Sequence, residues 1–234
     1  MAPEDCYEEV NRSSINDHID SLAGNNLLRA DARAKIYRSL FPFEPDSIAD
    51  IGCGVGLTAA ALKRTYPQAD VYGYDISENA IAYARRTDKD GVEFRAVTAG
   101  PDVVLERSFG TLIFQEFYPF TRTGNFVVHE DFLQFIVNNL AAGGVAFIQL
   151  AIRHPERTIL NNLPRLEAFC RQHDLALSRH MIPFDRLVDM IGSVGLSALL
   201  TPALAIVTGA DRRIVLMLRR IDEKTPGAAA AADQ

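Results

Sequence analysis

Residues 48–56 read Ile-Ala-Asp-Ile-Gly-Cys-Gly-Val-Gly, a short apolar run that breaks into three alternating glycines. The apolar part is typical of a buried strand, and residues 57–65 that follow it favour a helix. Glycines allow a sharp turn without a Cβ clash, so a ligand can lie against the main chain where the first N–H groups of the helix have no partner. The stretch therefore predicts a strand–loop–helix unit that binds a nucleotide-like cofactor.

The spacing of the glycines separates two kinds of cofactor. The dinucleotide fingerprint G-x-G-x-x-G needs its last glycine one position later, where Leu57 stands, and the Gly-Lys-Ser/Thr ending of a phosphate loop is absent. Asp50, two residues before the first glycine, would repel a pyrophosphate and suits a cationic ligand. A nicotinamide-dependent oxidoreductase is thus the weaker of two hypotheses.

An acidic residue followed by Gly-x-Gly-x-Gly resembles motif I of the class I S-adenosylmethionine-dependent methyltransferases. S-adenosylmethionine carries a sulfonium and an ammonium and no phosphate, which agrees with the carboxylate of Asp50. The resemblance implies that Gly52, Gly54 and Gly56 shape the loop at the methionine end and that Asp50 contacts or orients the ammonium. Cys53 would face this loop as a small filler rather than as a nucleophile.

A second element supports the same cofactor. The β-prone run 71–76 contains Asp75, about one helix and one strand beyond the glycines, where an acid accepts hydrogen bonds from ribose hydroxyls in nucleotide-binding βαβ units. The resemblance places Ile76 and Thr98 beside the adenine, although many members of the family have Asp where Thr98 stands. Gln115, at the end of the fourth expected strand, completes the predicted cofactor site.

Apolar runs and turn signals alternate from residue 48 onward. We expect strands at 48–51, 70–75, 92–96, 111–114 and 145–151, and helices at 57–65, 77–87 and 130–140, with Ser77 as an N-cap. Such alternation predicts a doubly wound α/β fold, in which helices cover both faces of a mostly parallel sheet.

The order changes after residue 151. Helices are expected at 156–173 and 184–193, followed by a strand region at 196–200 and 203–207 that Pro202 interrupts. A turn at residues 209–211 and a last strand at 214–218 would form an antiparallel hairpin. A parallel sheet that ends in such a hairpin is similar to the seven-stranded Rossmann-like methyltransferase fold.

The chain divides into three regions by pattern. Residues 1–45 are expected to form an N-terminal helical cap, with helices in 5–40 that break at 24–26. Residues 46–221 form the S-adenosylmethionine-binding domain, with inserted helices near 156–182. Residues 222–234 have no apolar side chain larger than alanine to bury, so we expect a disordered tail.

Composition limits the partners. With 234 residues, 48% hydrophobic and 23% charged, the chain can bury one good core. A net charge of −6 disfavours a sequence-independent grip on nucleic acid. The three cysteines lack metal spacing, and no signal peptide or long apolar run is present, so we expect a cytoplasmic protein with no metal and no membrane partner. A homodimer stays open.

An aromatic loop, residues 114–122, follows the fourth expected strand. Ligands of open parallel sheets lie beyond the carboxyl ends of the strands, so this loop is a candidate acceptor pocket with Glu116 and Tyr118 as candidate catalytic residues. Its phenylalanines, Phe117 and Phe120, can equally fill the core. His154, after the fifth strand, is the third catalytic candidate because a histidine can take a hydroxyl proton near neutral pH.

The residues together predict an enzyme that moves a methyl group from S-adenosylmethionine to an oxygen, nitrogen or carboxylate of a small molecule. The loop lacks Asn-Pro-Pro-Tyr and Asp-Pro-Pro-Tyr, which resemble the signatures of enzymes that methylate amino groups of nucleic acid bases and glutamine. Two alternatives remain: the nicotinamide-dependent oxidoreductase, and a non-catalytic cofactor-binding or scaffold protein that kept the loop.

Overall fold

The computed structural model describes residues 19–41, 43–152, 154–208 and 213–222. Its strands are β1 (Ser47–Ile51), β2 (Asp70–Asp75), β3 (Glu93–Ala96), β4 (Phe109–Gln115), β5 (Leu140–Ala151), β6 (Leu175–Ile182) and β7 (Arg213–Arg220). Its helices are α2 (Ile19–Leu40), α3 (Leu57–Thr65), α4 (Glu78–Thr87), α5 (Tyr118–Thr121), α6 (Phe126–Asn139), α7 (Leu163–Gln172), α8 (Asp185–Ile191) and α9 (Val194–Thr208), with 3-10 turns η1 (Pro155–Arg157) and η2 (Ile159–Asn162).

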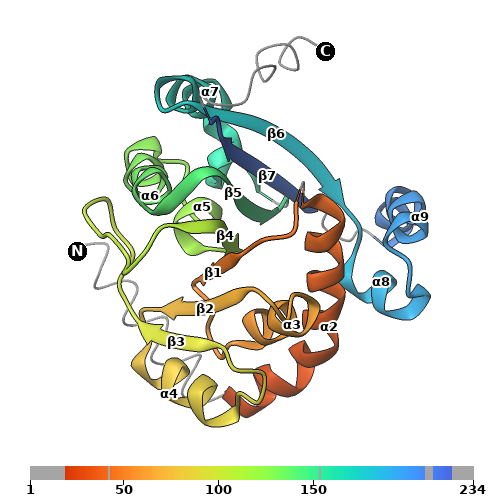
Figure 1. Ribbon diagram of the computed structural model, residues 1–234. Helices are drawn as coiled ribbons and strands as arrows, with labels where there is room; N and C mark the ends of the chain where they lie inside the picture. Colours follow the sequence, from red (N-terminus) through yellow and green to blue (C-terminus); the bar gives the residue numbers. More distant parts are fainter. Residues whose placement is uncertain (1–18, 42, 153, 209–212, 223–234) are drawn as a thin grey trace.

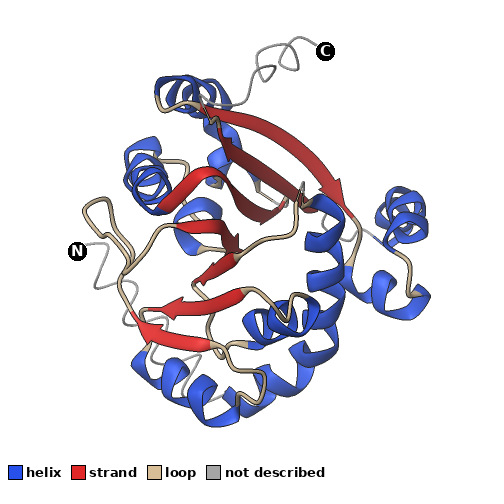
Figure 2. Cartoon of the chain, in the orientation of Figure 1, coloured by secondary structure: helices blue, strands red, loops and turns tan. Residues whose placement is uncertain are grey.

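The strands form one sheet, in the order β3-β2-β1-β4-β5-β7-β6 among the described residues. Neighbours from β3 to β5 run parallel, whereas β7 runs antiparallel to both β5 and β6. Figure 1 shows the sheet at the centre of the molecule, and Figure 2 shows its strands surrounded by helices. The predicted doubly wound α/β fold with an antiparallel end is confirmed.

Each face of the sheet has its own core because successive strand residues point to opposite sides. On β5, for example, Ile148 belongs to the core under α6 and α7, whereas Phe147 belongs to the core under α2, α3 and α8. Ser77 caps α4 as predicted, since its side chain accepts from Ala80 N. β1 is paired on both sides and buried along its whole length, which explains why the motif is largely apolar up to its glycines.

The region after β5 differs from the prediction in two places. Residues 196–207 lie in the helix α9 rather than in strands, although the helix contains Pro202. Both sides of β7 are already paired, with β5 and β6, so the sheet leaves no place for a strand there. The second antiparallel strand is instead β6. It lies at the edge of the sheet and has polar residues at 178–180, so its sequence does not show the apolar run of a buried strand.

Two further expectations were wrong. The segment 156–173 is two 3-10 turns followed by α7: Pro155 begins the first turn, Thr158 caps the second, and Pro164 lies in the first turn of α7. The expected break at 24–26 is absent, since α2 runs from Ile19 to Leu40. Residues 1–18, the turn at 209–211 and the tail from 223 lie outside the described residues, and the division of the chain at residue 46 stays a prediction.

Asn139 ties the long connection between β3 and β4 to the end of α6. Its side chain is fully buried, and Oδ1 accepts from Leu105 N at 2.6 Å while Nδ2 donates to Val103 O at 2.9 Å and to Phe135 O at 2.8 Å. All three hydrogen bonds of the Asn139 side chain are to backbone atoms. One side chain thus supplies partners for backbone groups of a connection that has no regular secondary structure.

We predict that Asn139→Ala lowers the free energy of unfolding by roughly 2–3 kcal/mol, because it leaves buried backbone groups unsatisfied. Urea denaturation followed by circular dichroism measures the change. Asp131→Ala, on an exposed position of the same helix, is the control and should change stability little. Equal stability of the two variants would show that the loop does not depend on this amide.

Candidate functional site

The glycine loop is held to the end of β2 by backbone hydrogen bonds. Gly52 N and Cys53 N both donate to Tyr74 O, at 2.7 Å and 3.0 Å, and Gly56 N donates to Cys53 O at 3.0 Å. Gly52, Gly54 and Gly56 all have positive φ, of 76°, 54° and 80°. This conformation favours glycine, which explains why every second residue of the loop lacks a side chain.

The three glycines nevertheless have different surroundings. A Cβ at Gly56 would lie 2.5 Å from the Phe94 ring, and one at Gly52 would lie 2.9 Å from the Phe117 ring. A Cβ at Gly54 would meet nothing within 4 Å. Gly56 therefore serves packing between the loop and β3, while the main chain at Gly54 borders open space that a ligand can occupy.

Asp75 lies directly across from Gly54. Its Oδ2 accepts from Gly54 N at 2.8 Å and its Oδ1 accepts from Ser77 N at 2.8 Å. Burial raises the pKa of Asp75 above its usual range, although these two N–H groups act in the opposite direction. Each carboxylate oxygen has a second lone pair, so Asp75 can still accept from a pair of hydroxyl groups.

Asp50, at the end of β1, is almost fully buried, with 2% of its surface exposed. Burial first, and then the charge of Asp75, raise the pKa of Asp50 to about 7, whereas Arg33 and the Ala59 N–H lower it. Among the described residues Asp50 Oδ2 has no hydrogen-bond partner. A buried carboxylate oxygen without a donor, beside an open glycine loop, is suited to a cationic donor.

A row of polar side chains continues from Asp50 across the same face of the sheet, under α2. Gln115 of β4 pairs in register with Gln149 of β5, and Tyr37 of α2 donates to Gln149 Oε1 at 2.8 Å. With its amide oriented so that the nitrogen donates to Thr58 Oγ1 at 3.2 Å, Gln115 accepts from Arg33 Nη1 at 3.0 Å. Polar groups from β1, β4, β5, α2 and α3 thus meet at the carboxyl ends of the strands.

Arg33 also belongs to an ion-pair cluster. Asp185 Oδ2, at the start of α8, accepts from Arg33 Nε at 3.0 Å and from Arg213 Nη1 at 2.6 Å. Asp185 is buried, so the cluster ties α2 and the beginning of β7 to α8. Sequence reasoning missed Arg33, Tyr37, Gln149 and Asp185, because they belong to no motif and come together only through the fold.

The structure places two of the three catalytic candidates together. Glu116 follows β4 with a positive φ of 49°, and its N–H donates to Gln149 O at 3.0 Å. Tyr118 begins α5 two residues later and is partly exposed. His154 follows β5 and is exposed, with 60% of its side chain accessible, and its Nδ1 is 3.3 Å from Glu156 Oε1. His154 is therefore the weakest of the three.

The remaining predicted residues lie around the loop or beside it. Ile76 is partly exposed after β2, and Thr98 is exposed in the connection that follows β3. Burial raises the pKa of the Cys53 thiol well above its usual range, which leaves the thiol protonated and a poor nucleophile. Phe120 is fully buried in the core with Phe114, whereas Phe117 is half-buried and covers Gly52.

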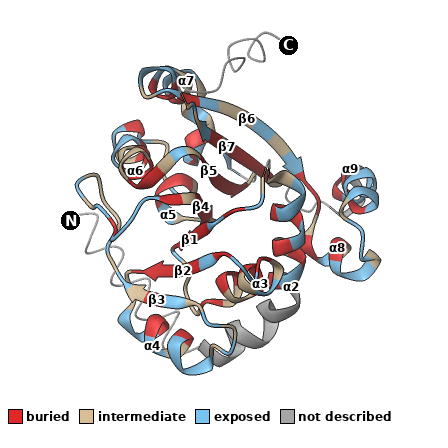
Figure 3. Cartoon of the chain, in the orientation of Figure 1, coloured by how far each residue is buried: buried red, intermediate tan, exposed pale blue. Residues whose placement is uncertain are grey.

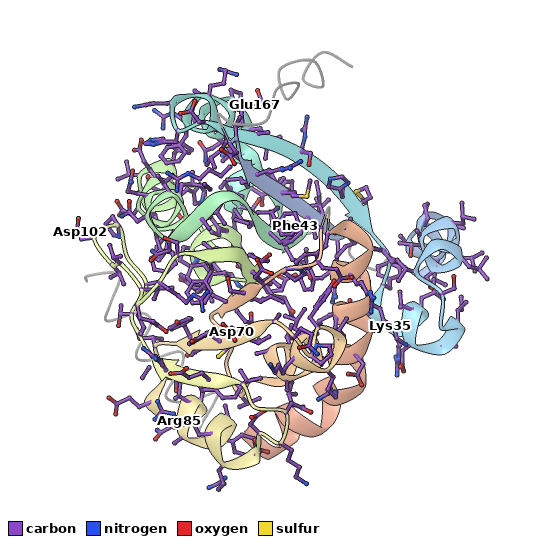
Figure 4. The ribbon with its side chains drawn as sticks, in the orientation of Figure 1. Lys35, Phe43, Asp70, Arg85, Asp102 and Glu167 are labelled. Atoms are coloured by element: carbon purple, nitrogen blue, oxygen red, sulfur yellow. The ribbon has the colours of Figure 1, made fainter. Side chains whose placement is uncertain are left out.

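The described ranges contain no group of three or more histidine, cysteine or acidic residues arranged to hold a metal ion. None of the helices there combines the length and the apolar character needed to cross a membrane. Figure 4 shows the side chains on the ribbon, with Lys35 on α2.

A family model described as a methyltransferase domain matches residues 48–121, which hold the glycine loop, Asp75 and the aromatic loop. Trans-aconitate 2-methyltransferase of Afipia carboxidovorans is 29% identical over 135 residues, 55% of this chain and 48% of that protein. Ribosomal RNA small subunit methyltransferase C of Pseudomonas syringae pv. tomato is 26% identical over 128 residues, 54% of this chain and 36% of that protein. The chain spans about half or less of the length of these curated relatives.

The fold itself has solved counterparts. The plantazolicin methyltransferase BpumL, in complex with SAH, has a TM-score of 0.54 and 16% identity, and the match covers 89% of this chain and 88% of that one. This likeness shows the fold, and the family model and the relatives cover the motif region. Over the motif region, the family model and the relatives support the predicted resemblance to the class I S-adenosylmethionine-dependent methyltransferases.

Proposed function

We propose that this protein transfers a methyl group from S-adenosylmethionine to a small-molecule acceptor. The observation that carries the proposal is the open main chain at Gly54, which donates to the Asp75 carboxylate and follows Asp50, a buried residue with an unpartnered carboxylate oxygen. Such a loop offers backbone and two carboxylates to a ligand that has hydroxyl groups and a positive charge, and it has no lysine or arginine of its own for a pyrophosphate.

The cofactor residues have separate tasks in this proposal. Asp75 would accept from the ribose hydroxyls, and Asp50 would receive the ammonium of the methionine part. Arg33, held by Asp185 and Gln115, would supply positive charge for the methionine carboxylate. The uncharged side chains that would line the cofactor site are Ile76, Thr98 and Cys53. When bound, S-adenosylmethionine supplies an electrophilic methyl group on sulfur.

The acceptor would lie beyond β4, beside Glu116 and Tyr118. These two polar groups stand next to the half-buried Phe117, which gives the place an apolar wall. Alignment alone contributes about 7–11 kcal/mol to reactions of positioned groups, so a good nucleophile needs no base here. Glu116 and Tyr118 are therefore proposed to orient the acceptor, with proton removal an added role where the acceptor is a hydroxyl.

The charge of the chain and the name of one relative favour a small-molecule acceptor. A net charge of −6 disfavours binding to RNA through its phosphates, and one relative is named as an enzyme acting on trans-aconitate, a small molecule. Another relative is named as a ribosomal RNA methyltransferase, so RNA must be an arm of the test.

The test is transfer of a tritiated methyl group from S-adenosylmethionine. We expect label in small carboxylic acids, amines or phenols and none in acid-precipitated RNA. Tyr118→Phe and Glu116→Gln should lower turnover while the affinity for S-adenosylhomocysteine stays the same, because they change acceptor orientation only. Glu130→Gln, exposed on α6, is the matched control. Label in RNA would replace the small-molecule proposal, and binding without any transfer would favour the scaffold alternative.

The glycines offer a second test. We predict that Gly54→Ala lowers the affinity for S-adenosylhomocysteine at least about tenfold, or ~1.4 kcal/mol, because the new methyl enters the space proposed for the cofactor. Gly56→Ala should destabilise the fold more than Gly54→Ala, since its Cβ meets the Phe94 ring. Calorimetry and thermal unfolding measure the two effects.

Gly143→Ala controls for backbone strain. Gly143 also has a positive φ, of 70°, and open space around it, but it lies near the start of β5 and away from the loop. It should lose stability as Gly54→Ala does and keep full affinity. Unchanged affinity for S-adenosylhomocysteine in Gly54→Ala would show that the cofactor does not lie against Gly54.

The raised pKa of Asp50 predicts a pH dependence. Between pH 3.8 and about 7 the folded protein keeps a proton that the unfolded chain has lost, so Asp50 makes the fold less stable as pH rises through this window. An ammonium favours the charged carboxylate, so S-adenosylhomocysteine should bind more tightly at pH 8 than at pH 6. Calorimetry at both values checks this. Asp50→Asn should flatten the dependence, and an unchanged slope in that variant would assign it to Asp75 or another group.

A further inference from the structure

The helix α9 is turned with its apolar side outward. Ser197 and Thr201 are buried together with Ala205, whereas Leu196, Leu199 and Leu200 are 48%, 78% and 45% exposed. Figure 3 shows α9 at the rim of the molecule with exposed residues along it. A surface helix of a monomer normally has the opposite arrangement, with leucines inward and hydroxyl side chains outward.

Hydrogen bonds hold this orientation. Thr201 Oγ1 donates to Ser197 O at 2.8 Å and accepts from Phe184 N, just before α8, at 3.3 Å. Ser197 Oγ donates to Ser193 O at 2.6 Å. The buried hydroxyls are thus satisfied where they are, and the inner residues Ser197, Thr201 and Ala205 recur every fourth position as one face of a helix. A roll of α9 would break the contact with Phe184, so the leucines stay outside.

The exposed leucines form one continuous stripe. Leu196, Leu199 and Leu200, with the exposed Ala203, stand at positions i, i+3, i+4 and i+7. This spacing is that of a helix face that packs on another helix, and a small residue such as Ala203 permits close approach. Met190 of α8, 77% exposed, adds another large apolar side chain to the same pair of helices.

Charge decides between kinds of partner. The fifteen residues of α9 include no charged side chain, although the whole chain carries a net charge of −6. In a contact between two copies each residue meets the same surface of the other copy, so charged faces of an acidic protein repel and an uncharged stripe does not. The stripe also shows no basic residue that would favour an anionic membrane or an acidic partner.

We propose that α9 is the contact surface for a second copy of this chain, in which the two α9 helices pack against each other about a twofold axis. A standard interface buries about 800 Å² per partner. One helical stripe is smaller than this, so α8 must contribute, and the dimer should dissociate on dilution. The inference does not depend on the proposed function.

The test is sedimentation equilibrium over a wide range of concentration. We expect the unmodified protein to be a dimer at high concentration and Leu199→Glu to be a monomer throughout, with the same thermal unfolding in dilute solution. Val104→Glu is the matched control, because Val104 is 70% exposed in the connection between β3 and β4 and should leave the dimer intact. An unmodified protein that stays monomeric, or a Leu199→Glu variant that stays dimeric, overturns the proposal.

A cross-link identifies the surface independently. In Leu199→Cys, oxidation should join two chains, because equivalent residues near a twofold axis lie close together. The unmodified protein treated in the same way controls for the natural cysteines, of which Cys170 is buried. Cross-linking no greater than in that control would show that α9 does not face its counterpart and would overturn the proposal.

Discussion

The parallel pairing of β1 with β2 on one side and β4 on the other is the constraint on which the site depends. Parallel strands end at the same edge, so this pairing brings the glycine loop after β1, Asp75 at the end of β2 and Gln115 at the end of β4 together. The hydrogen bond from Gly54 N to Asp75 then fixes the loop against β2. A slip of one residue in β1 would turn Asp50 to the other face of the sheet.

The carboxylates buried at that edge of the sheet are electrostatically unfavourable. Asp50 is buried with one oxygen unsatisfied, Asp75 lies close enough to raise its pKa further, and Arg33 offsets only part of the repulsion. A buried charge without a full set of partners destabilises a fold and is seldom retained for stability. The arrangement makes physical sense if a cation completes it, and a cofactor with an ammonium and a sulfonium would do so.

The sequence was sufficient for the motif and for the parallel part of the sheet, because both are local patterns. Strand, glycine loop and helix follow one another without a gap, and Ser77 caps its helix within three residues. An antiparallel end of the sheet was predicted correctly, but one of its two strands was assigned to the wrong residues. Residues 175–182 carry polar groups because they form an edge, and the apolar residues of α9 look like a buried strand although they face outward.

Arg33 illustrates the part of the site that no local pattern predicts. It lies in α2, outside both motifs, and reaches Gln115 and Asp185 only because α2 packs on the face of the sheet and against α8. Long-range ion pairs of this kind depend on which helix covers which strand. Local signals in the sequence, such as glycines, helix caps and apolar periods, contain no such information.

The segment between β6 and β7 contains both α8, which holds Arg33, and α9, which carries the exposed leucines. Asp185 begins α8 and holds Arg33 and Arg213 at the edge where the cofactor is proposed to lie, while α9, the next helix, turns its leucines outward. Figure 1 shows both helices beside the end of β6, next to α2. A surface that packs on α9 would therefore restrain the element that positions Arg33. Arg33 also lowers the pKa of Asp50, so Asp185 of α8 belongs to the same group of charges as the carboxylate beside the glycine loop.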